Sequence, residues 1–408
     1  MKHNWGKELF PKIVWFQEGP GVRNTQYRDT GVKLLNVANL VDSHVDLSTS
    51  NRYISEEEAY GKYKHFLVDD GDFIIASSGI QASYFHKKMG FINKTHLPLC
   101  MNTSTIRFKV LDDSKLNIYF FQYYLKSFDF NLQLQKALTG CAQLNFGPSH
   151  LKKMKCPLPP MVVQEHIVAE LDKINETIED CCELLRNLDA LAQSLFFNYF
   201  GDPVSNPKKW PVKRLKALTS LITNGTTPKG GQAVYVDRGI TFLRSQNVWR
   251  DRLVMDDVAY IDEETNATMK GSMLHHNDIL ITKTGRINTE NSSLGRSALF
   301  TGEDNTANIN GHVYLVRLNG TLNPRFVLTI LLTESYRGLI RRVCVGAIDK
   351  RQLNLSHIEQ FPIILPPLEL QEKFSARVEQ INEQKKIVEN TIAELQTLLD
   401  SRMDYWFN

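Results

Sequence analysis

One sequence pattern occurs twice in this chain, 207 residues apart, and it limits the fold more than any other feature. Leu-Pro-Pro begins at Leu158 and again at Leu365, and a Gln-Glu pair follows at the same distance in both copies. A proline at the first helical position gives up an amide that would have no partner there, so the pattern predicts a helix start. A helical pattern then runs to Phe200 and to Phe407. The sequence therefore predicts a tandem duplication in which a long helix ends each half.

Both predicted helices repeat core residues every seven positions, as a coiled coil does. In the first copy the two core positions hold Ile167, Ile174, Cys181, Leu188 and Leu195, and Leu171, Ile178, Leu185 and Ala192. In the second copy they hold Phe374, Ile381, Val388, Leu395 and Arg402, and Val378, Lys385, Ile392 and Leu399. Each helix could instead lie alone on its own domain. Matching seams at matching positions favour pairing of the two helices.

Lys385 and Arg402 interrupt the second seam. A polar residue at such a position often fixes the register of a coiled coil, and we expect these two to do so or to face a partner protein. At 1.5 Å per residue, each helix of about 40 residues would be roughly 60 Å long. Antiparallel packing of the two would give the duplicated chain a pseudo-two-fold axis.

The net charge of +3 is unevenly distributed along the 408 residues. Residues 1–155 carry a net charge of +6 and residues 201–362 also carry +6, whereas residues 156–200 carry −6 and residues 363–408 carry −3. A polyanion would be drawn to the basic segments, which leaves the acidic helices for protein partners. With 42% hydrophobic residues, no long apolar run, no apolar N-terminal signal and no Cys-x-x-Cys pair, we expect a folded cytoplasmic protein without a zinc site.

The segments before the helices are also copies, although fainter ones. Residues 31–39 match residues 239–247, and residues 71–79 match residues 277–285, where a polar turn, a short apolar strand and a Gly turn follow one another. We therefore predict an α+β fold in which two similar strand-rich domains are separated by two long helices. The predicted boundaries are residues 1–157, 158–200, 201–364 and 365–408.

Two basic domains held apart in symmetric orientations suit double-stranded DNA, whose symmetric readers address half-sites separated by about one helical turn or multiples of it. Arg, Asn and Gln side chains on turns have the geometry to read base edges. In the first half the candidate DNA-binding residues are Arg23, Asn24, Gln26, Asn36, Asn39, Ser77, Ser78, Gln81, Lys87 and Lys88. In the second half they are Thr226, Thr227, Arg244, Gln246, Asn247, Arg250, Arg252, Lys283, Thr284 and Arg286. Because matched positions differ, we expect the halves to read different sequences.

Three features of the chain stand out together: the repeat with its two helix starts, the early turns at Gly19 and Gly225, and the strand-Gly units ending at Gly79 and Gly285. In these features the chain resembles the specificity (S) subunits of type I restriction-modification systems. The resemblance covers essentially the whole chain. It implies two target-recognition domains, each reading one half of a bipartite DNA site, joined by helices that form an antiparallel coiled coil. It also implies two methyltransferase (modification) subunits bound to the helices, with restriction-translocase subunits joining that core. One departure is that residues 206–215 start the second half in the manner of the family, whereas the first half has no clear equivalent.

The chain has no recognisable catalytic motif. It contains no Asn-Pro-Pro-aromatic motif for adenine methylation and no phosphate-binding loop for ATP. The run from Asp278 to Lys283 resembles a nuclease motif, but the matching run in the first half has Ser77 at the position of Lys283. His44, His275 and His276 lack further metal ligands nearby in sequence. We therefore expect a non-enzymatic chain without a metal or cofactor, with S-adenosylmethionine, ATP and Mg bound by partner subunits.

Two other functions remain open from the sequence. A coiled-coil assembly protein could grip nucleic acid or protein through its basic domains without reading sequence, and a diverged nuclease is a third candidate. Two protected patches of DNA separated by an unread gap would identify a reader, whereas uniform protection would identify an assembly protein.

Overall fold

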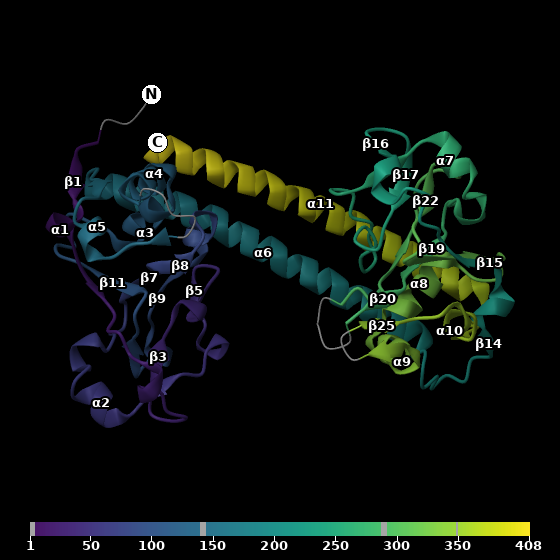
Figure 1. Cartoon of the computed structure of the whole chain (residues 1–408), viewed down its shortest axis with the longest axis horizontal. Helices are drawn as coiled ribbons and strands as arrows, with labels where there is room; N and C mark the ends of the chain where they lie inside the picture. Colours follow the sequence, from purple (N-terminus) through teal and green to yellow (C-terminus); the bar gives the residue numbers. More distant parts are fainter. Residues whose placement is uncertain (1–4, 139–143, 287–291, 348–349) are drawn as a thin grey trace. The chain divides into compact units, whose positions relative to one another are not determined.

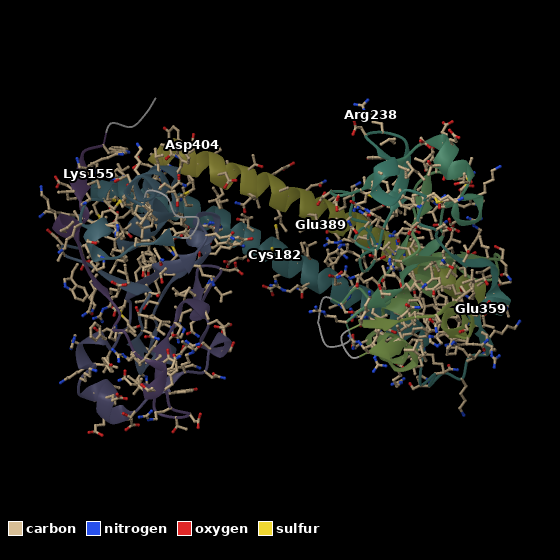
Figure 2. The ribbon with its side chains drawn as sticks, in the orientation of Figure 1. Lys155, Cys182, Arg238, Glu359, Glu389 and Asp404 are labelled. Carbon is tan, nitrogen blue, oxygen red and sulfur yellow. The ribbon has the colours of Figure 1, made fainter. Side chains whose placement is uncertain are left out.

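The computed structural model describes residues 5–138, 144–286, 292–347 and 350–408, which form two compact units. The first unit contains residues 1–182 and 390–408, and the second contains residues 183–389. Figure 2 labels Cys182 and Glu389, at which the units divide along the two long helices. Each unit therefore combines a strand-rich part with pieces of both helices. The predicted domain boundaries stay predictions, because this division follows compactness alone.

The first unit contains two main sheets. The antiparallel order β2-β11-β7-β9 joins Val14–Glu18, Thr105–Val110, Phe73–Ala76 and Met89–Phe91. The order β10-β3-β6 joins Leu99–Met101, Val32–Leu35 and Tyr53–Ile54, with β10 parallel to β3. Helices α3 (Ile118–Lys126) and α4 (Phe128–Ala137) contribute buried aromatic rings to the core, in which the rings of Phe121 and Phe108 lie 5.3 Å apart.

The second unit repeats this plan. The order β15-β23-β19-β21 joins Thr219–Asn224, Val313–Leu318, Ile279–Thr282 and Ser297–Leu299. The order β16-β18-β17-β22 joins Tyr235–Val236, Ala259–Ile261, Ile240–Leu243 and Ala307–Ile309, with β17 parallel to β22. Helices α8 (Pro324–Leu332) and α9 (Glu334–Val343) take the places of α3 and α4 (Figure 1). The predicted α+β duplication is confirmed.

The smaller elements are short and mostly link the sheets. The short helices are α1 (Phe10–Ile13), α2 (Glu56–Tyr60), α5 (Pro148–Leu151), α7 (Glu263–Ala267) and α10 (Leu355–Glu359). The short strands are β4 (Leu40–Val41), β5 (His44–Val45), β8 (Ser78–Ile80), β12 (Leu144–Asn145), β20 (Thr284–Gly285), β24 (Val345–Ala347) and β25 (Lys350–Gln352). None of the helices among the described ranges is long and apolar enough to cross a membrane.

The two long helices are α6 (Met161–Phe200) and α11 (Leu368–Phe407). In the first unit the start of α6 pairs with the end of α11: the rings of His166 and Trp406 lie 5.9 Å apart, and Glu170 accepts from Arg402 Nη2 at 3.0 Å. In the second unit the end of α6 pairs with the start of α11, where the rings of Phe196 and Phe374 lie 5.6 Å apart. The pairing is antiparallel within each unit, as Figure 1 shows for the two helices.

Both polar seam positions are paired across the two helices. In the second unit Lys385 Nζ lies 2.6 Å from Asp189 Oδ1 on α6. In the first unit Arg402 binds Glu170, which also accepts the indole N–H of Trp406 at 2.8 Å. The expectation that Lys385 and Arg402 face a partner protein is corrected, because each already has a carboxylate on the opposite helix. Cross-helix pairs of this kind are well suited to fixing register.

The predicted seam residues are all buried or half-buried. The buried ones are Ile167, Leu171, Ile174, Phe374, Val378, Ile381 and Val388. Ile167 and Leu171 belong to the core of the first unit, and Phe374 and Val378 belong to that of the second. The half-buried ones are Ile178, Leu185, Leu188, Leu195, Ile392, Leu395 and Leu399. In a pair of helices, each seam residue is covered only on the side that faces the partner helix. Partial burial is therefore expected of a two-stranded coiled coil.

The first half does have the N-terminal strand that its sequence did not reveal. Strand β1 (Lys7–Leu9) pairs antiparallel with β13 (Lys155–Pro157), just as β14 (Val212–Arg214) pairs with β26 (Pro362–Ile364). The amide of Leu158 donates to the Gly6 carbonyl, and that of Leu365 donates to the Pro211 carbonyl. This corrects the prediction that residues 206–215 lack an equivalent. A three-residue strand is too short to carry a recognisable sequence pattern.

The matched turn glycines of the two halves, Gly19 and Gly225, lie against backbone. A Cβ at Gly19 would overlap the carbonyl oxygen of Asn102, and one at Gly225 would overlap that of Ile309. Only glycine permits this approach, because any side chain would displace the strand beside it. The turns at Gly19 and Gly225 thus fix the path of the chain where it leaves the ends of β2 and β15.

Candidate nucleic-acid interface

Two of the predicted DNA-binding residues shape a turn instead of facing solvent. Asn39 is fully buried: its Oδ1 accepts from the Asn36 amide at 3.0 Å and its Nδ2 donates to the Asp46 carbonyl at 3.0 Å. Asn247 repeats this arrangement with the Arg244 amide at 2.9 Å and the Val254 carbonyl at 2.9 Å. Both predictions are corrected, because these side chains satisfy buried backbone groups.

Ser77 is a third correction. Its side chain is fully buried at the end of β7, and its amide donates to the Ser104 carbonyl at 2.8 Å. The next residue, Ser78, is half-buried and bonds Ser104 through its hydroxyl. Ser77 therefore contributes to the turn that follows β7 through its backbone and Ser78 through its side chain, whereas Gln81 beyond the turn is exposed.

The remaining first-unit candidates fall into two groups. Lys87 and Lys88 lie beside the β4-β5 hairpin, where Lys87 Nζ is 3.3 Å from Asp42 and Lys88 Nζ donates to the Leu40 carbonyl at 2.7 Å. Asn36 accepts from Asn102 at 2.8 Å. Separately, Arg23 and Asn24 are exposed at the start of a short turn, whereas Gln26 in that turn donates to Glu58 at 2.6 Å. No described hydrogen bond or ion pair joins the two groups.

In the second unit the Asp257 carboxylate binds two of the candidate DNA-binding residues, Arg244 and Gln246. Arg244 Nη2 lies 3.1 Å from Asp257 Oδ1, and Gln246 Nε2 donates to Asp257 Oδ2 at 2.8 Å. These hydrogen bonds, from Gln246 first and then Arg244, lower the pKa of the Asp257 carboxyl. The Arg244 side chain is only 14% exposed. The turn therefore presents Gln246 more openly than Arg244, which already has a carboxylate partner.

In the second unit Val248 pairs with Leu253 and closes a short hairpin, and Trp249 stacks with arginines at its tip. The guanidinium of Arg296 lies 3.9 Å from the centroid of its ring, and that of Arg252 lies 6.0 Å away. Arg250 precedes Asp251, whose left-handed backbone forms the tip and whose carboxylate binds Arg325. Stacking on an aromatic face pre-orients a guanidinium. Arg250 and Arg252 are exposed at this tip, and their contact with DNA stays a prediction.

The other second-unit candidates lie on two turns. Thr226 and Thr227 are exposed beyond the turn at Gly225. Lys283 lies 5.7 Å from the centroid of the Tyr314 ring, and Thr284 lies in β20, which pairs with β25 and, through it, β24. Arg286 follows β20 and is exposed.

Sequence reasoning missed three arginines near this surface. Arg296 precedes β21, whereas Arg337 and Arg341 lie one turn apart on α9. Burial lowers the pKa of the Arg337 guanidinium, and repulsion from Arg250 adds to this effect, as does repulsion from Arg341 and Arg296. The i, i+4 spacing on a helix was the signal that could have identified Arg337 and Arg341.

Asp278, the first residue of the nuclease-like run, has a structural role. Asp278 is buried and accepts from Arg317 through both oxygens, at 2.9 and 2.7 Å, and from the His275 amide at 2.7 Å. Asp72 and Arg107 form the matching buried pair in the first unit, at 3.0 Å. In the second unit these hydrogen bonds join Arg317 on β23 to the residue before β19, and these are the two central strands of their sheet. Within the described ranges there is no cluster of three or more His, Cys, Asp or Glu residues suited to a metal ion.

Comparison with known proteins identifies the family. The family model for the type I restriction modification DNA specificity domain matches residues 30–182 and again residues 207–397. The chain belongs to this family and contains two copies of its domain. The MjaVIII specificity subunit of a type I restriction enzyme from Methanocaldococcus jannaschii is 24% identical over 177 residues, which cover 43% of this chain and 40% of that protein. The chain spans about two fifths of the length of the curated relatives that it matches.

Two solved structures share the fold over nearly the whole chain. The S subunit of a type I restriction-modification system from M. genitalium has a TM-score of 0.56 and 14% identity, covering 99% of this chain and 96% of that one. A chain from a structural study of complex assembly and conformational transition in the type I R-M system has a TM-score of 0.55 and 16% identity, covering 99% and 97%. At these identities the similarity shows the fold.

Proposed function

We propose that this chain is the DNA-reading specificity subunit of a type I restriction-modification complex, with one half-site of a bipartite target read by each unit. The observation that carries the proposal is a pair of equivalent hairpins with different tips. Asn39 and Asn247 hold the same turn, and the pairing of Leu40 with Val45 recurs as that of Val248 with Leu253. The same scaffold thus presents different side chains, which suits the reading of two sequences.

The chemistry at the two tips differs in charge. At the first tip Asp42 is bound by Lys87, whereas Arg250 stands at the matching position in the second unit, next to exposed Arg252. Arginine at a turn has the fork that guanine and phosphate accept, whereas the first tip has Lys87 and Lys88 beside it. We infer that the two units read unlike half-sites, with phosphate contacts setting their position.

The paired helices are proposed to set the spacing between half-sites and to bind two methyltransferase subunits, with restriction-translocase subunits joining the complex. Acidic exposed side chains on both helices favour protein partners over DNA. We further infer that methylation and cleavage are carried out by those partners, which would bind S-adenosylmethionine, ATP and Mg. The ion pair of Asp278 with Arg317 supports a structural use of the single nuclease-like run.

The decisive experiment is to express the full chain with its methyltransferase partners and sequence the methylated adenines of the host genome. We expect one recurrent split motif with a fixed unread gap. Exchanging residues 201–364 for the equivalent segment of another family member should then change one half of the motif only. Methylation without a motif, or a change in both halves, would overturn the proposal.

A further inference from the structure

A pocket in the second unit is lined by arginines from two separate segments. Its lining consists of Arg286, Ser292, Leu294, Gly295, Arg337, Ile340 and Arg341. We call this the arginine pocket. Arg286 follows β20, and Arg337 and Arg341 project from α9. Three arginines thus line one hollow.

Positive charge continues along the rim of the pocket. Arg296 donates through Nε to the carbonyl of Ser292, a lining residue, and its guanidinium is stacked on Trp249. Burial lowers the pKa of the Arg296 guanidinium, and repulsion from Arg250 adds to this effect. Five arginines therefore share one surface, and several of them are close enough to repel one another.

Among the described residues, one carboxylate forms ion pairs with the arginines that line the pocket. Arg337 Nη1 lies 3.6 Å from Glu334 and Arg341 Nη1 lies 3.1 Å from the same carboxylate. Glu334 is 74% exposed, so solvent screens its attraction. One screened carboxylate shared by two arginines leaves the pocket strongly cationic, which favours a bound anion.

The wall of the pocket depends on one glycine. Gly295 has a left-handed backbone, with φ of +67°, and a Cβ there would come within 2.9 Å of Ile340 Cγ2. Glycine thus lets α9 approach the segment that precedes β21. This close approach brings Arg337 near enough to Arg296 for the two charges to repel each other.

The first unit lacks this arrangement at the equivalent positions. Because Ser127 and Thr333 cap α4 and α9 in the same way, Asn131 and Gln135 stand where Arg337 and Arg341 stand. The amide of Thr282 donates to the Arg296 carbonyl as that of Ala76 does to the Lys88 carbonyl, so Lys88 matches Arg296. The arginine pocket is therefore a specialisation of the second unit and no requirement of the shared fold.

We propose that the arginine pocket binds a phosphate group, and that its occupant is a backbone phosphate of DNA beside the half-site of the second unit. The forked, planar guanidinium pairs with phosphate through two parallel hydrogen bonds, and several forks around one hollow suit a tetrahedral anion. This inference rests on the proposed function for the identity of the ligand. The contact fixes position and carries no sequence information.

The test is DNA binding by the full chain, measured by fluorescence anisotropy at several salt concentrations on a target duplex and on a random duplex. Arg286→Gln and Arg341→Gln should each weaken binding by the same factor on both duplexes, roughly tenfold. Each should also reduce the slope of log K against log salt concentration by about 1. Arg286 is exposed, so its replacement is expected to leave folding intact.

Two variants on α9 sharpen this test. Arg342→Gln is the matched control, because Arg342 is exposed on the same helix and does not line the pocket; the proposal requires it to change binding less than Arg341→Gln does. Glu334→Gln should strengthen binding to both duplexes, since it removes the carboxylate that competes with phosphate for Arg337 and Arg341.

The outcomes separate this inference from the proposed function. Loss of binding to the target duplex only would make these arginines base readers, and an unchanged salt slope would exclude a phosphate contact. If Arg286→Gln abolishes binding of inorganic phosphate but leaves both duplexes bound as before, the pocket is a site for small anions and the assignment to DNA is overturned. If the native chain does not prefer its target, sequence reading fails, yet the salt slope on random DNA still decides the role of the pocket.

Discussion

Gln371 accepts the backbone amide of Asn323 on its Oε1 at 3.0 Å, and its Nε2 donates to the Pro366 carbonyl at 2.8 Å. Asn323 is the residue that caps α8. Gln164 makes the same contacts with the Asn117 amide at 2.9 Å and the Pro159 carbonyl at 2.9 Å, and Asn117 caps α3. The glutamine of the repeated motif therefore joins the start of a long helix to the start of a domain helix in each unit.

Replacing Gln371 by alanine should destabilise the second unit by about 1–3 kcal/mol, because it leaves the Asn323 amide and the Pro366 carbonyl buried without partners. Gln164→Ala should act likewise on the first unit. Urea unfolding followed by circular dichroism measures both. Gln396→Ala is the control, since Gln396 is exposed on α11 and its loss should be almost neutral. Equal effects of the Gln371 and Gln396 variants would refute the structural role of the motif.

The aromatic ends of the long helices anchor them to the strand-rich parts. Phe200 is fully buried, with its ring 4.7 Å from that of Phe326, and Phe407 lies 5.4 Å from Phe120 in the first unit. Phe200→Ala should cost about 3–5 kcal/mol through lost burial and the cavity left behind. Phe197→Ala, at a ring that is 40% exposed on the same helix, should cost far less. Thermal unfolding of the two variants checks the difference, and similar melting temperatures would show that the anchor is unimportant.

Acidification should weaken the helix pair of the first unit. The hydrogen bond from Arg402, helped by one from Trp406, holds the pKa of Glu170 below its ordinary value of 4.5. A carboxyl with a lower pKa in the folded chain stabilises it above the unfolded pKa, and this stabilisation is lost as the pH falls through the folded pKa. The free energy of unfolding should therefore fall more between about pH 6 and pH 3 in the native chain than in Glu170→Gln. Parallel pH profiles would contradict this linkage.

The predictable features were those that repeat along the chain. Heptads, matched helix starts and paired glycines are periodic or duplicated signals, and they identified both long helices and the two copies of one fold. Burial was harder to predict. Asn39, Asn247 and Ser77 have the composition of surface turns, but all three are buried, and the side chains of Asn39 and Asn247 satisfy backbone groups that only the folded turn creates. Arg296 and Arg337 were missed because distant segments bring them together in tertiary structure alone.

The helix pair should act as a ruler if the proposed function is right. Adding one heptad after Cys182 in α6 and one after Glu389 in α11 preserves the repeat of the seam. Seven residues lengthen a helix by about 10.5 Å, which corresponds to roughly three base pairs of DNA. Methylome sequencing should then show the same two half-sites with a gap about three base pairs longer.

The insertion also rotates one half-site around the duplex, because three base pairs are about a third of a helical turn. We therefore expect weaker binding of the lengthened site than of the native one, with the half-site sequences unchanged. A heptad in α6 alone is the control: it shifts Asp189 away from Lys385 and should lower stability without giving a defined new gap. An unaltered gap in the double insertion would show that spacing is set elsewhere than in the helices.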